Sequence, residues 1–526
     1  MSNVAKHLSS HLTPSAAAGP RDKIRSLTEL AAISQRHRAL GQTVVQAHGA
    51  FDLLHLGHVR HLEAARRLGD LLVVTVTADQ YVNKGPGRPV FNGDLRAEML
   101  ASLEYVDWVA VNNAPDAVNA IDCIRPSIYI KGQDYQNPQG DITGKITLER
   151  EAVEAHGGRI HFTEEVMFSS TELINRHLNI FEPQIRNYLE TMREDDGLND
   201  LIELIDRVRD YRVLIIGDAI IDEYQYVLPM GKTPKENMIA TRYQDRELFA
   251  GGVFAAANHV ASFCRHVDVI TCLGETDSYE DLARQSLSAN VRLNALVRPG
   301  APTTLKRRFV DPSYMRKLFE VYFMNDEPLT GDLQHTLDDT VASMVSDYDV
   351  VIAADFGHGL LGPTTIEKLI SQSRFLAVNT QSNSANLGYN LITKYSRADY
   401  ICIDAPEARL AISDRISTTG DVARTIVEDH VDCSKIIITH GKHGCVTYER
   451  GGLVHTIPAF AKNVIDTVGA GDAFLAITAP LVAAGGAMHH IGFIGNVVGA
   501  LKVEIVGHRR AIDKASLIKA ITGLLK

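Results

Sequence analysis

The chain of 526 residues is longer than one hydrophobic core usually supports, so two or three domains are expected. Its residues are 45% hydrophobic and 22% charged with a net charge of -11, a composition that is typical of a globular protein and argues against binding to a nucleic-acid backbone. The six cysteines include no Cys-x-x-Cys pair, which argues against a structural zinc site and a disulfide scaffold.

The N-terminal residues 1–20 are polar and rich in Ala and Ser, and we expect them to form a mobile tail. They lack the charged and then apolar order of a signal peptide. The longest apolar run, residues 473–488, is interrupted by Pro480 and two glycines and is too short to cross a bilayer. We therefore expect a cytoplasmic protein with no membrane partner.

The first domain begins with a strand–helix–strand pattern. Helical spacing over residues 21–40 is followed by a β-branched strand at 43–51, a helix at 52–68 and a second strand at 71–77. Such a short alternation predicts a βαβ unit with a parallel sheet. We place the tail and first helix in residues 1–40 and the first domain in residues 41–182.

His55 and His58 lie at the predicted junction of strand and helix, with Gly57 between them. A spacing of three puts both imidazoles on one side of the first helical turn. Imidazoles can donate hydrogen bonds to phosphate oxygens, and the glycine lets a nucleotide lie close to the backbone. A metal site that includes His61, or an ordinary pair of surface histidines, are the alternatives.

Residues 49–58 resemble the signature of the His-x-Gly-His nucleotidyltransferase superfamily, and its further segments follow in order over about residues 43–178. These segments are Lys84 to Val90, Asp94 to Arg96, Lys131 to Tyr135 and Phe168 to Thr171. The resemblance is closest to the sugar-phosphate and glycerol-phosphate branch and implies a Rossmann-like, cytidylyltransferase-like fold. It implies nucleotide contacts from Gly49, Phe51, Gly57, Lys84, Arg88, Lys131, Ser169, Ser170 and Thr171, of which the last three are also good N-cap residues.

In such an enzyme a phosphate monoester attacks the α-phosphate of a nucleoside triphosphate, and pyrophosphate leaves. The attacking oxygen is ionised near pH 7, so the site needs positive groups rather than a general base. His55, His58, Lys84 and Arg88 could supply them, with Mg²⁺ bridging the triphosphate. Asp52 has the wrong charge for phosphate and is assigned to structure or to metal binding. The polar segment 141–150 either shapes the acceptor pocket or only connects elements.

Residues 183–209 contain a proline, a run of charges and a glycine between periodic apolar positions, and we interpret them as a helical linker. In residues 210–526 strands alternate with helices, which predicts a doubly wound α/β sheet with ligands at the carboxyl ends of its strands. Strands are predicted within 211–218, 302–310, 318–323, 350–355, 375–379, 400–404 and 435–439.

The stretch 463–474 predicts a tight loop that feeds a helix, because Gly469 and Gly471 flank Ala470 and lead into an apolar run. The unpaired amides and the dipole of a helix start suit a phosphoryl group in transit. Asp472, in the first turn, could take the proton of a substrate hydroxyl. An isolated motif of this kind would usually be an N-cap on a buried helix.

Residues 466–474 resemble the C-terminal signature of the ribokinase-like, or PfkB-type, sugar kinases over nine consecutive positions. The resemblance implies a small β lid over the sugar, Asp472 as catalytic base, and Gly469, Ala470 and Gly471 as an anion hole. It implies sugar contacts from Asp218, Asp222, Gly251, Gly252, Lys306 and Arg308, although the two aspartates could equally be turn formers. It implies nucleotide contacts from Asn379, Glu407, Thr439, Gly441 and Gly444, with Glu407 also reaching a metal through water.

Some positions depart from the family pattern. Asp404 stands where the family usually has Asn. Residues 379–383 replace the Asp-Pro-Lys segment of the nearest heptose kinases, and His358 stands where those kinases have a Lys. Ala255 and Ala256 lie where relatives place an Asn. The catalytic positions are intact and the sugar-contact positions are not, so the reaction is better supported than the sugar.

A nucleotidyltransferase followed by a sugar kinase resembles the bifunctional enzymes of ADP-heptose synthesis, with the order of the domains reversed. The resemblance implies ATP-dependent phosphorylation of a sugar phosphate similar to heptose 7-phosphate, and nucleotidyl transfer to a sugar 1-phosphate that gives an ADP- or CDP-sugar and pyrophosphate. We expect Mg²⁺, ATP or CTP, small-molecule substrates and a homo-oligomer. The alternatives are a cytidylyltransferase for a polyol phosphate fused to a different carbohydrate kinase, and a domain retained only for ligand sensing or oligomerisation.

Overall fold

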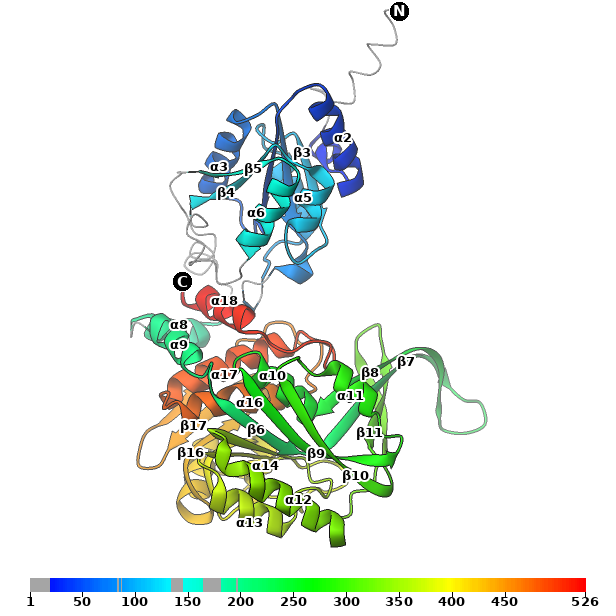
Figure 1. The fold of residues 1–526 in the computed structure, drawn as a ribbon, viewed down its shortest axis with the longest axis vertical. Coiled ribbons are helices and arrows are strands. Elements are labelled where there is room, and N and C mark those ends of the chain that lie inside the picture. Colours follow the sequence, from blue (N-terminus) through cyan, green and yellow to red (C-terminus); the bar gives the residue numbers. More distant parts are fainter. Residues whose placement is uncertain (1–18, 83–84, 87, 134–144, 164–180, 195–196) are drawn as a thin grey trace, which may run out of the picture. The chain divides into compact units, whose positions relative to one another are not determined.

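The computed structural model describes residues 19–82, 85–86, 88–133, 145–163, 181–194 and 197–526 (Figure 1). The chain divides into two compact units: residues 1–182 with 522–524 and 526, and residues 183–521 with 525. Residues 183–209, expected as a linker, form the helices α8 (Pro183–Glu194) and α9 (Gly197–Arg207), which belong to the second unit.

The first unit is built on a sheet of five parallel strands in the order β3-β2-β1-β4-β5. Its strands are β1 (Val44–Gly49), β2 (Leu71–Thr77), β3 (Trp108–Asn112), β4 (Ile128–Gly132) and β5 (Arg159–Thr163). Its described helices include α2 (Leu27–Ala39), α3 (Leu56–Arg67), α4 (Gly93–Ala101), α5 (Val118–Ile124) and α6 (Lys145–Ala155). Buried side chains of α3 and α4 pack on one face, and those of α2, α5 and α6 on the other. The parallel, Rossmann-like sheet predicted for this domain is confirmed.

The helix predicted over residues 21–40 begins only at Leu27. Ser26 and Glu29 form a capping box there, in which the Ser26 hydroxyl oxygen accepts the Glu29 N–H and the Glu29 carboxylate accepts the Ser26 N–H at 2.8 Å. These side chains satisfy amides that the first helical turn leaves unpaired, so they fix the start of the helix.

The second unit contains a nine-stranded sheet in the order β10-β9-β6-β13-β14-β15-β16-β17-β18, in which only β17 and β18 run antiparallel to their neighbours. Its strands are β6 (Arg212–Gly217), β9 (His266–Thr276), β10 (Val291–Pro302), β13 (Val350–Asp355), β14 (Leu376–Thr380), β15 (Arg397–Asp404), β16 (Asp432–Thr439), β17 (Cys445–Glu449) and β18 (Val454–Ile457). Its helices include α10 (Val253–Ala261), α11 (Glu280–Ser286), α12 (Gly331–Met344), α13 (Pro363–Gln372), α14 (Ala405–Ala411), α15 (Thr419–Thr425), α16 (Ala470–Ala483) and α17 (Met488–Lys502), with α18 (Lys514–Leu525) at the end of the chain.

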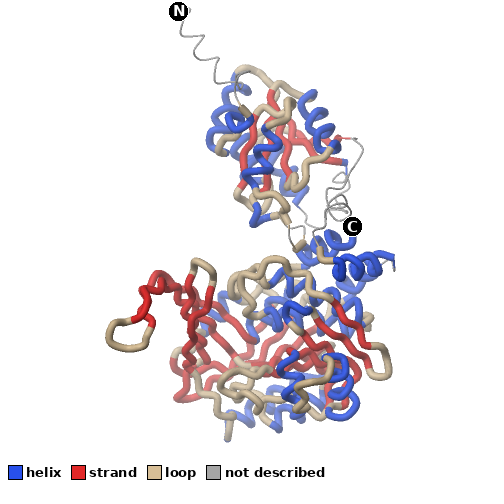
Figure 2. Tube along the Cα trace, turned by 180° about the vertical axis from the view of Figure 1, so that it is seen from behind, coloured by secondary structure: helices blue, strands red, loops and turns tan. Residues whose placement is uncertain are grey.

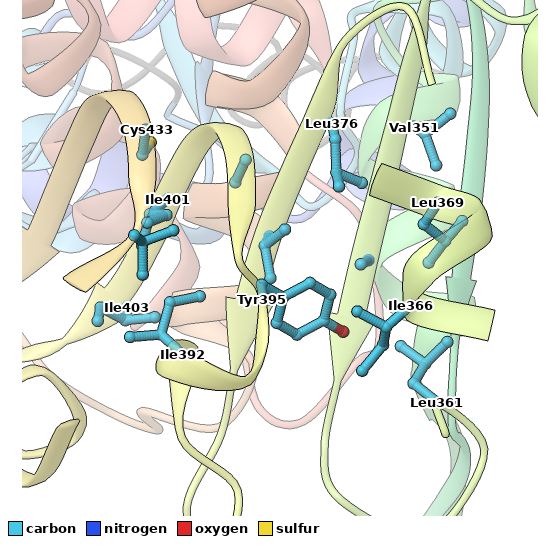
Figure 3. Packing of buried hydrophobic residues seen from close by; sticks show 14 of the residues in the cluster. Val351, Leu361, Ile366, Leu369, Leu376, Ile392, Tyr395, Ile401, Ile403 and Cys433 are labelled. Atoms are coloured by element: carbon cyan, nitrogen blue, oxygen red, sulfur yellow. The ribbon is translucent and has the colours of Figure 1, made fainter. Parts of the chain in front are cut away.

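Helices cover both faces of this large sheet. The helices α10, α16 and α17 lie on one face, and α12, α13 and α14 on the other (Figure 1). On the second face, Val351 of β13 and Leu376 of β14 pack with Ile366 and Leu369 of α13 (Figure 3). This two-sided core explains why the strands read as continuous apolar runs in the sequence.

A separate sheet of four strands in the order β12-β11-β7-β8 forms the lid predicted beside the large sheet. Its strands are β7 (Ala219–Lys232), β8 (Ile239–Gly252), β11 (Thr304–Asp311) and β12 (Arg316–Phe323). The ends of β7 and β8 extend from the rest of the unit as a long hairpin (Figure 2). Because β7 follows β6 after a single residue, the lid is joined directly to the carboxyl end of a central strand.

Candidate active sites

The two predicted histidines lie together where β1 gives way to α3. His55 is the N-cap of α3, and its Nδ1 accepts the N–H of Gly57 at 3.1 Å. The two imidazoles stack with ring centroids 3.9 Å apart, and Phe51 meets His58 edge-on at 5.2 Å. Because Nδ1 of neutral His55 accepts, its proton lies on Nε2, where it can donate to a phosphate oxygen.

Asp52 and Arg88 form a buried ion pair, with Oδ2 and Nη1 2.6 Å apart and the arginine side chain 2% exposed. The other carboxylate oxygen of Asp52 accepts the N–H of Val90 at 2.6 Å. These contacts favour the structural assignment of Asp52. Arg88 was expected to meet nucleotide phosphates, and within the described residues its buried Nη2 has no hydrogen-bond partner. That nitrogen therefore keeps a donor for a ligand.

The other predicted transferase residues fall into two groups. Gly49 ends β1 against the ring of Phe51, and Lys131 on β4 pairs with Glu149 at 2.8 Å. Lys84, Ser169, Ser170 and Thr171 lie outside the described residues, as do Asp134, Tyr135 and residues 141–144.

The metal alternative for the histidine pair finds no support. His61 Nδ1 is bonded to Thr163 Oγ1 at 2.7 Å, and burial together with the charge of Lys131 lowers the pKa of His61 to about 4. Within the described ranges, no three His, Cys, Asp or Glu side chains are grouped as a metal centre would require.

In the second unit, α16 begins at the predicted glycine loop. Gly469 is its N-cap with φ of 73°, and Asp472 lies in the first turn with 9% of its surface exposed. Asp472 Oδ1 accepts a hydrogen bond from Gln381 Nε2 at 2.6 Å, and no ion pair within the described residues engages it. Burial raises the pKa of Asp472, which suits a side chain that must accept a proton.

The two glycines of this loop give a matched prediction. Gly469→Ala is expected to destabilise the second unit by roughly 1–2 kcal/mol, because of its left-handed backbone and because a Cβ would lie 2.4 Å from His508 Cε1. Gly471→Ala is expected to unfold as the wild type does, since a Cβ there meets no atom within 4 Å, but to slow phosphoryl transfer by filling open space beside the amides. Thermal unfolding and kinase rates check both; an unchanged rate in Gly471→Ala would place the phosphoryl group elsewhere.

His508 is a site residue that the sequence did not indicate. Its Nε2 lies 3.2 Å from Asp222 Oδ2, and its ring lies against Gly469 and Gly251. Burial alone would raise the pKa of Asp222, but the hydrogen bond from His508 and the charge of Arg308 hold it well below its usual value. His508 therefore joins the predicted sugar-contact residues to the predicted anion hole.

Asp218 organises the loop after β13. Its carboxylate accepts the N–H groups of Phe356, His358 and Leu360 at 3.1, 3.3 and 3.2 Å. Burial, with the nearby charge of Asp355, raises the pKa of Asp218 to about 6. These hydrogen bonds make Asp218 a supporting group for the loop after β13.

His358 and Lys306 are buried polar residues that lie near each other. Both ring nitrogens of His358 are buried and have no hydrogen-bond partner within the described residues. Burial, and then the charge of Lys306, lower the pKa of His358 to about 3, so the ring is neutral and offers one donor and one acceptor. The Lys306 ammonium lies 5.4 Å from the ring centre of Tyr322. A sugar hydroxyl, which both donates and accepts, matches this pair.

Glu407 lies near the carboxyl ends of β14 and β15. It forms a capping box with Asp404, whose N–H it accepts at 2.9 Å, and it also accepts the N–H of Ser382 at 2.9 Å. Burial raises the pKa of Glu407 to about 7. Asn379 is buried and donates to Cys402 O at 2.7 Å. The remaining predicted nucleotide residues occupy the end of β16 and the turn after it: Thr439, Gly441 and Gly444.

Asp466 is a second residue that the sequence reasoning missed, although it lies within the quoted signature. Its carboxylate accepts the Tyr224 hydroxyl of β7 at 2.6 Å and the Lys317 ammonium of β12 at 2.6 Å. It also accepts the backbone N–H groups of Val468 and Gly507. One buried carboxylate thus connects two lid strands to the loop that carries Gly469 and to the loop that carries His508.

The fold and these sites define a sugar-kinase unit joined to a nucleotidyltransferase unit, and comparison with known proteins agrees. The chain belongs to the pfkB family of carbohydrate kinases, whose model matches residues 211–515. A cytidylyltransferase-like family model matches residues 47–176.

The curated relatives match the N-terminal region. "Bifunctional protein HldE" of Syntrophotalea carbinolica is 39% identical over 163 residues, which is 30% of this chain and 32% of that protein. The protein of the same name from Trichlorobacter lovleyi is 38% identical over 170 residues, 32% of each. The chain therefore spans about a third of the length of these relatives.

Two solved structures were also similar to the chain. Arabidopsis thaliana ribokinase, complexed with ribose and ATP, has a TM-score of 0.46 and 16% identity and covers 60% of this chain and 99% of its own. Escherichia coli phosphofructokinase-2, in complex with substrates and products, has a TM-score of 0.48 and 12% identity and covers 60% of this chain and 100% of its own. Among the described residues, no helix combines the length and apolar character that crossing a membrane requires.

Proposed function

We propose that the chain is a bifunctional enzyme of nucleotide-sugar synthesis. Its second unit phosphorylates a sugar phosphate similar to heptose 7-phosphate from ATP, and its first unit transfers a nucleotidyl group to a sugar 1-phosphate. The observation that carries the proposal is Asp472, a buried carboxylate with a raised pKa in the first turn of a helix whose N-cap is a left-handed glycine. That arrangement pairs a proton acceptor with the amides at the start of the helix for the transferred group.

The kinase residues divide the work by their chemistry. Asp472 takes the proton of the attacking hydroxyl, while Gln381 holds the carboxylate in place. Lys306 and His358 orient the sugar by hydrogen bonds, since both ring nitrogens of His358 are buried without a partner within the described residues and the Lys306 ammonium lies over the ring of Tyr322. The amides of Gly469 and Gly471 receive charge that develops on the phosphoryl oxygens, while the Ala470 N–H donates to Thr467 O at 3.3 Å.

The transferase residues act mainly by neutralising charge. The stacked pair of His55 and His58 donates to phosphate oxygens, and the remaining nitrogen of Arg88 can do the same. Since the sugar 1-phosphate is already ionised at neutral pH, no base is required, and in-line placement of the two substrates supplies most of the rate.

Mg²⁺ fits the carboxylate chemistry near the predicted ATP site. Mg²⁺ binds through one or two carboxylates and substrate phosphates and keeps several waters, so it needs no preformed cage of protein ligands. Glu407, whose oxygens each have a second lone pair beyond the backbone bonds they accept, would hold it through water. When bound, the ion neutralises triphosphate charge.

We also propose that the protein is cytoplasmic and forms a homo-oligomer. Sedimentation of the purified chain would test the oligomeric state.

Two assays on the full chain test the proposed function. The kinase assay presents ATP with a panel of sugars and sugar phosphates, and we expect turnover with a heptose 7-phosphate-like compound. The transferase assay measures exchange of labelled pyrophosphate into ATP or CTP with a sugar 1-phosphate present. Exchange into CTP that requires a polyol phosphate would instead support the cytidylyltransferase alternative, which the cytidylyltransferase-like match favours. Absence of both activities would refute a catalytic role.

A further inference from the structure

Lys502, at the end of α17, is a lysine with no exposed surface. Its ammonium donates to two backbone carbonyls, Val468 O at 2.7 Å and Gly507 O at 2.8 Å. Within the described residues, no carboxylate lies within ion-pair distance of it. An ammonium buried without a paired anion costs several kcal/mol. A methionine of similar length would fill the same space without that cost, so packing alone does not account for the charge.

The two carbonyls belong to the loops that carry the kinase site. Val468 directly precedes Gly469 of the anion hole, and Gly507 directly precedes His508, which bonds Asp222. Asp466 accepts the N–H groups of the same two residues, Val468 and Gly507. The loops are therefore joined twice, through their amides by Asp466 and through their carbonyls by Lys502.

The direction of the Val468 carbonyl fixes the direction of the next amide. In a trans peptide the C=O and the following N–H point to opposite sides. Because Val468 O points to the ammonium of Lys502, the N–H of Gly469 points away from it. The same reasoning applies to Gly507 O and the N–H of His508. Lys502 thus fixes the two peptide planes so that the N–H groups of Gly469 and His508 point away from its ammonium.

We propose that Lys502 is a positioning residue for phosphoryl transfer, a covalently attached cation that orients the anion-hole loop from behind and adds positive charge to the site. The proposal rests on the proposed kinase activity. Burial lowers the pKa of Lys502, and the negative charges of Asp466, Asp472 and Asp222 oppose that fall, so these carboxylates favour the charged form.

The first test removes the charge and keeps the side-chain length. In the full chain, Lys502→Met is expected to lower the kcat of the kinase on the order of 100-fold, with little change in the KM of the sugar phosphate and none in pyrophosphate exchange. Lys514→Met is the matched control, because Lys514 is a half-buried lysine of the same unit whose ion pair is with Asp206. A wild type without kinase activity would refute the proposed function, whereas an active wild type with an equally active Lys502→Met would overturn this proposal alone.

The second test returns the cation. Lys502→Ala leaves space beside the two carbonyls, and added methylammonium or ammonium is expected to restore kcat by at least about tenfold, with no effect on the wild type or on Lys502→Met, whose side chain fills the space. The same cations are expected to raise the unfolding temperature of Lys502→Ala only. If Lys502→Ala is slow and no cation restores it, or folds neither with nor without a cation, Lys502 has a purely structural role and the proposal fails.

Discussion

Asp472→Asn is expected to lower the kcat of the kinase on the order of 1,000-fold while pyrophosphate exchange by the transferase stays unchanged. The asparagine keeps the size of the side chain but cannot take a proton from the sugar hydroxyl. The fold is expected to tolerate the change, because the amide of Gln381 can turn so that its oxygen accepts from the new amide. Steady-state rates of both reactions, measured on the same preparation, check the result.

Asp332→Asn is the matched control for this experiment. Asp332 also lies in the first turn of a helix, α12, but it is exposed. It is expected to keep both activities. An Asp472→Asn enzyme that retains more than a tenth of the kinase rate would show that another group takes the proton, and an equal loss of both activities would contradict two separate sites.

His55→Asn is expected to lower the transferase rate on the order of 100-fold and to leave the kinase unchanged, because a phosphate loses one preorganised donor. Asparagine is itself a favoured N-cap, so its side chain can accept the N–H of Gly57 as His55 does. The substitution therefore separates the imidazole's chemistry from its role at the start of α3. The unfolding temperature of the first unit and the rate of pyrophosphate exchange are the two measurements.

His161→Asn serves as the control for the histidine experiment, since His161 is exposed on β5. It should match the wild type in both assays. If His55→Asn loses stability in proportion to its loss of rate, His55 acts only as a helix cap. If His55→Asn keeps full activity, His55 is not part of the transferase site.

The parts of both sites that lie within one short stretch of sequence were predictable. The glycine loop before Asp472 and the histidines before α3 each join a strand or loop to a helix, and local spacing suffices to predict such junctions. The buried strands were predictable for a similar reason, because a parallel sheet covered on both faces produces continuous apolar runs. The bounds of helices were less predictable, because capping side chains such as Ser26 fix where α2 begins, a few residues after the predicted start.

The residues that were missed act across long separations in the chain. Asp466 meets Tyr224, 242 residues away, and Lys317, 149 residues away, while Gln381 and Asp472 are 91 residues apart. Nothing in the local pattern around these residues indicates such partners. The same limit applies to Arg88, whose predicted phosphate contact stays a prediction and whose ion-pair partner Asp52, 36 residues earlier, was not foreseen.

The carboxylate of Asp466 has a consequence for how the enzyme treats water as a competing acceptor. Because Asp466 is bonded to two of the four lid strands, β7 and β12, and to the loop that begins α16, displacement of the lid would remove two of its donors and loosen its hold on that loop. Under the proposed function, an open lid would therefore leave the phosphoryl-transfer site less ordered, which would disfavour transfer of the phosphoryl group from ATP to water.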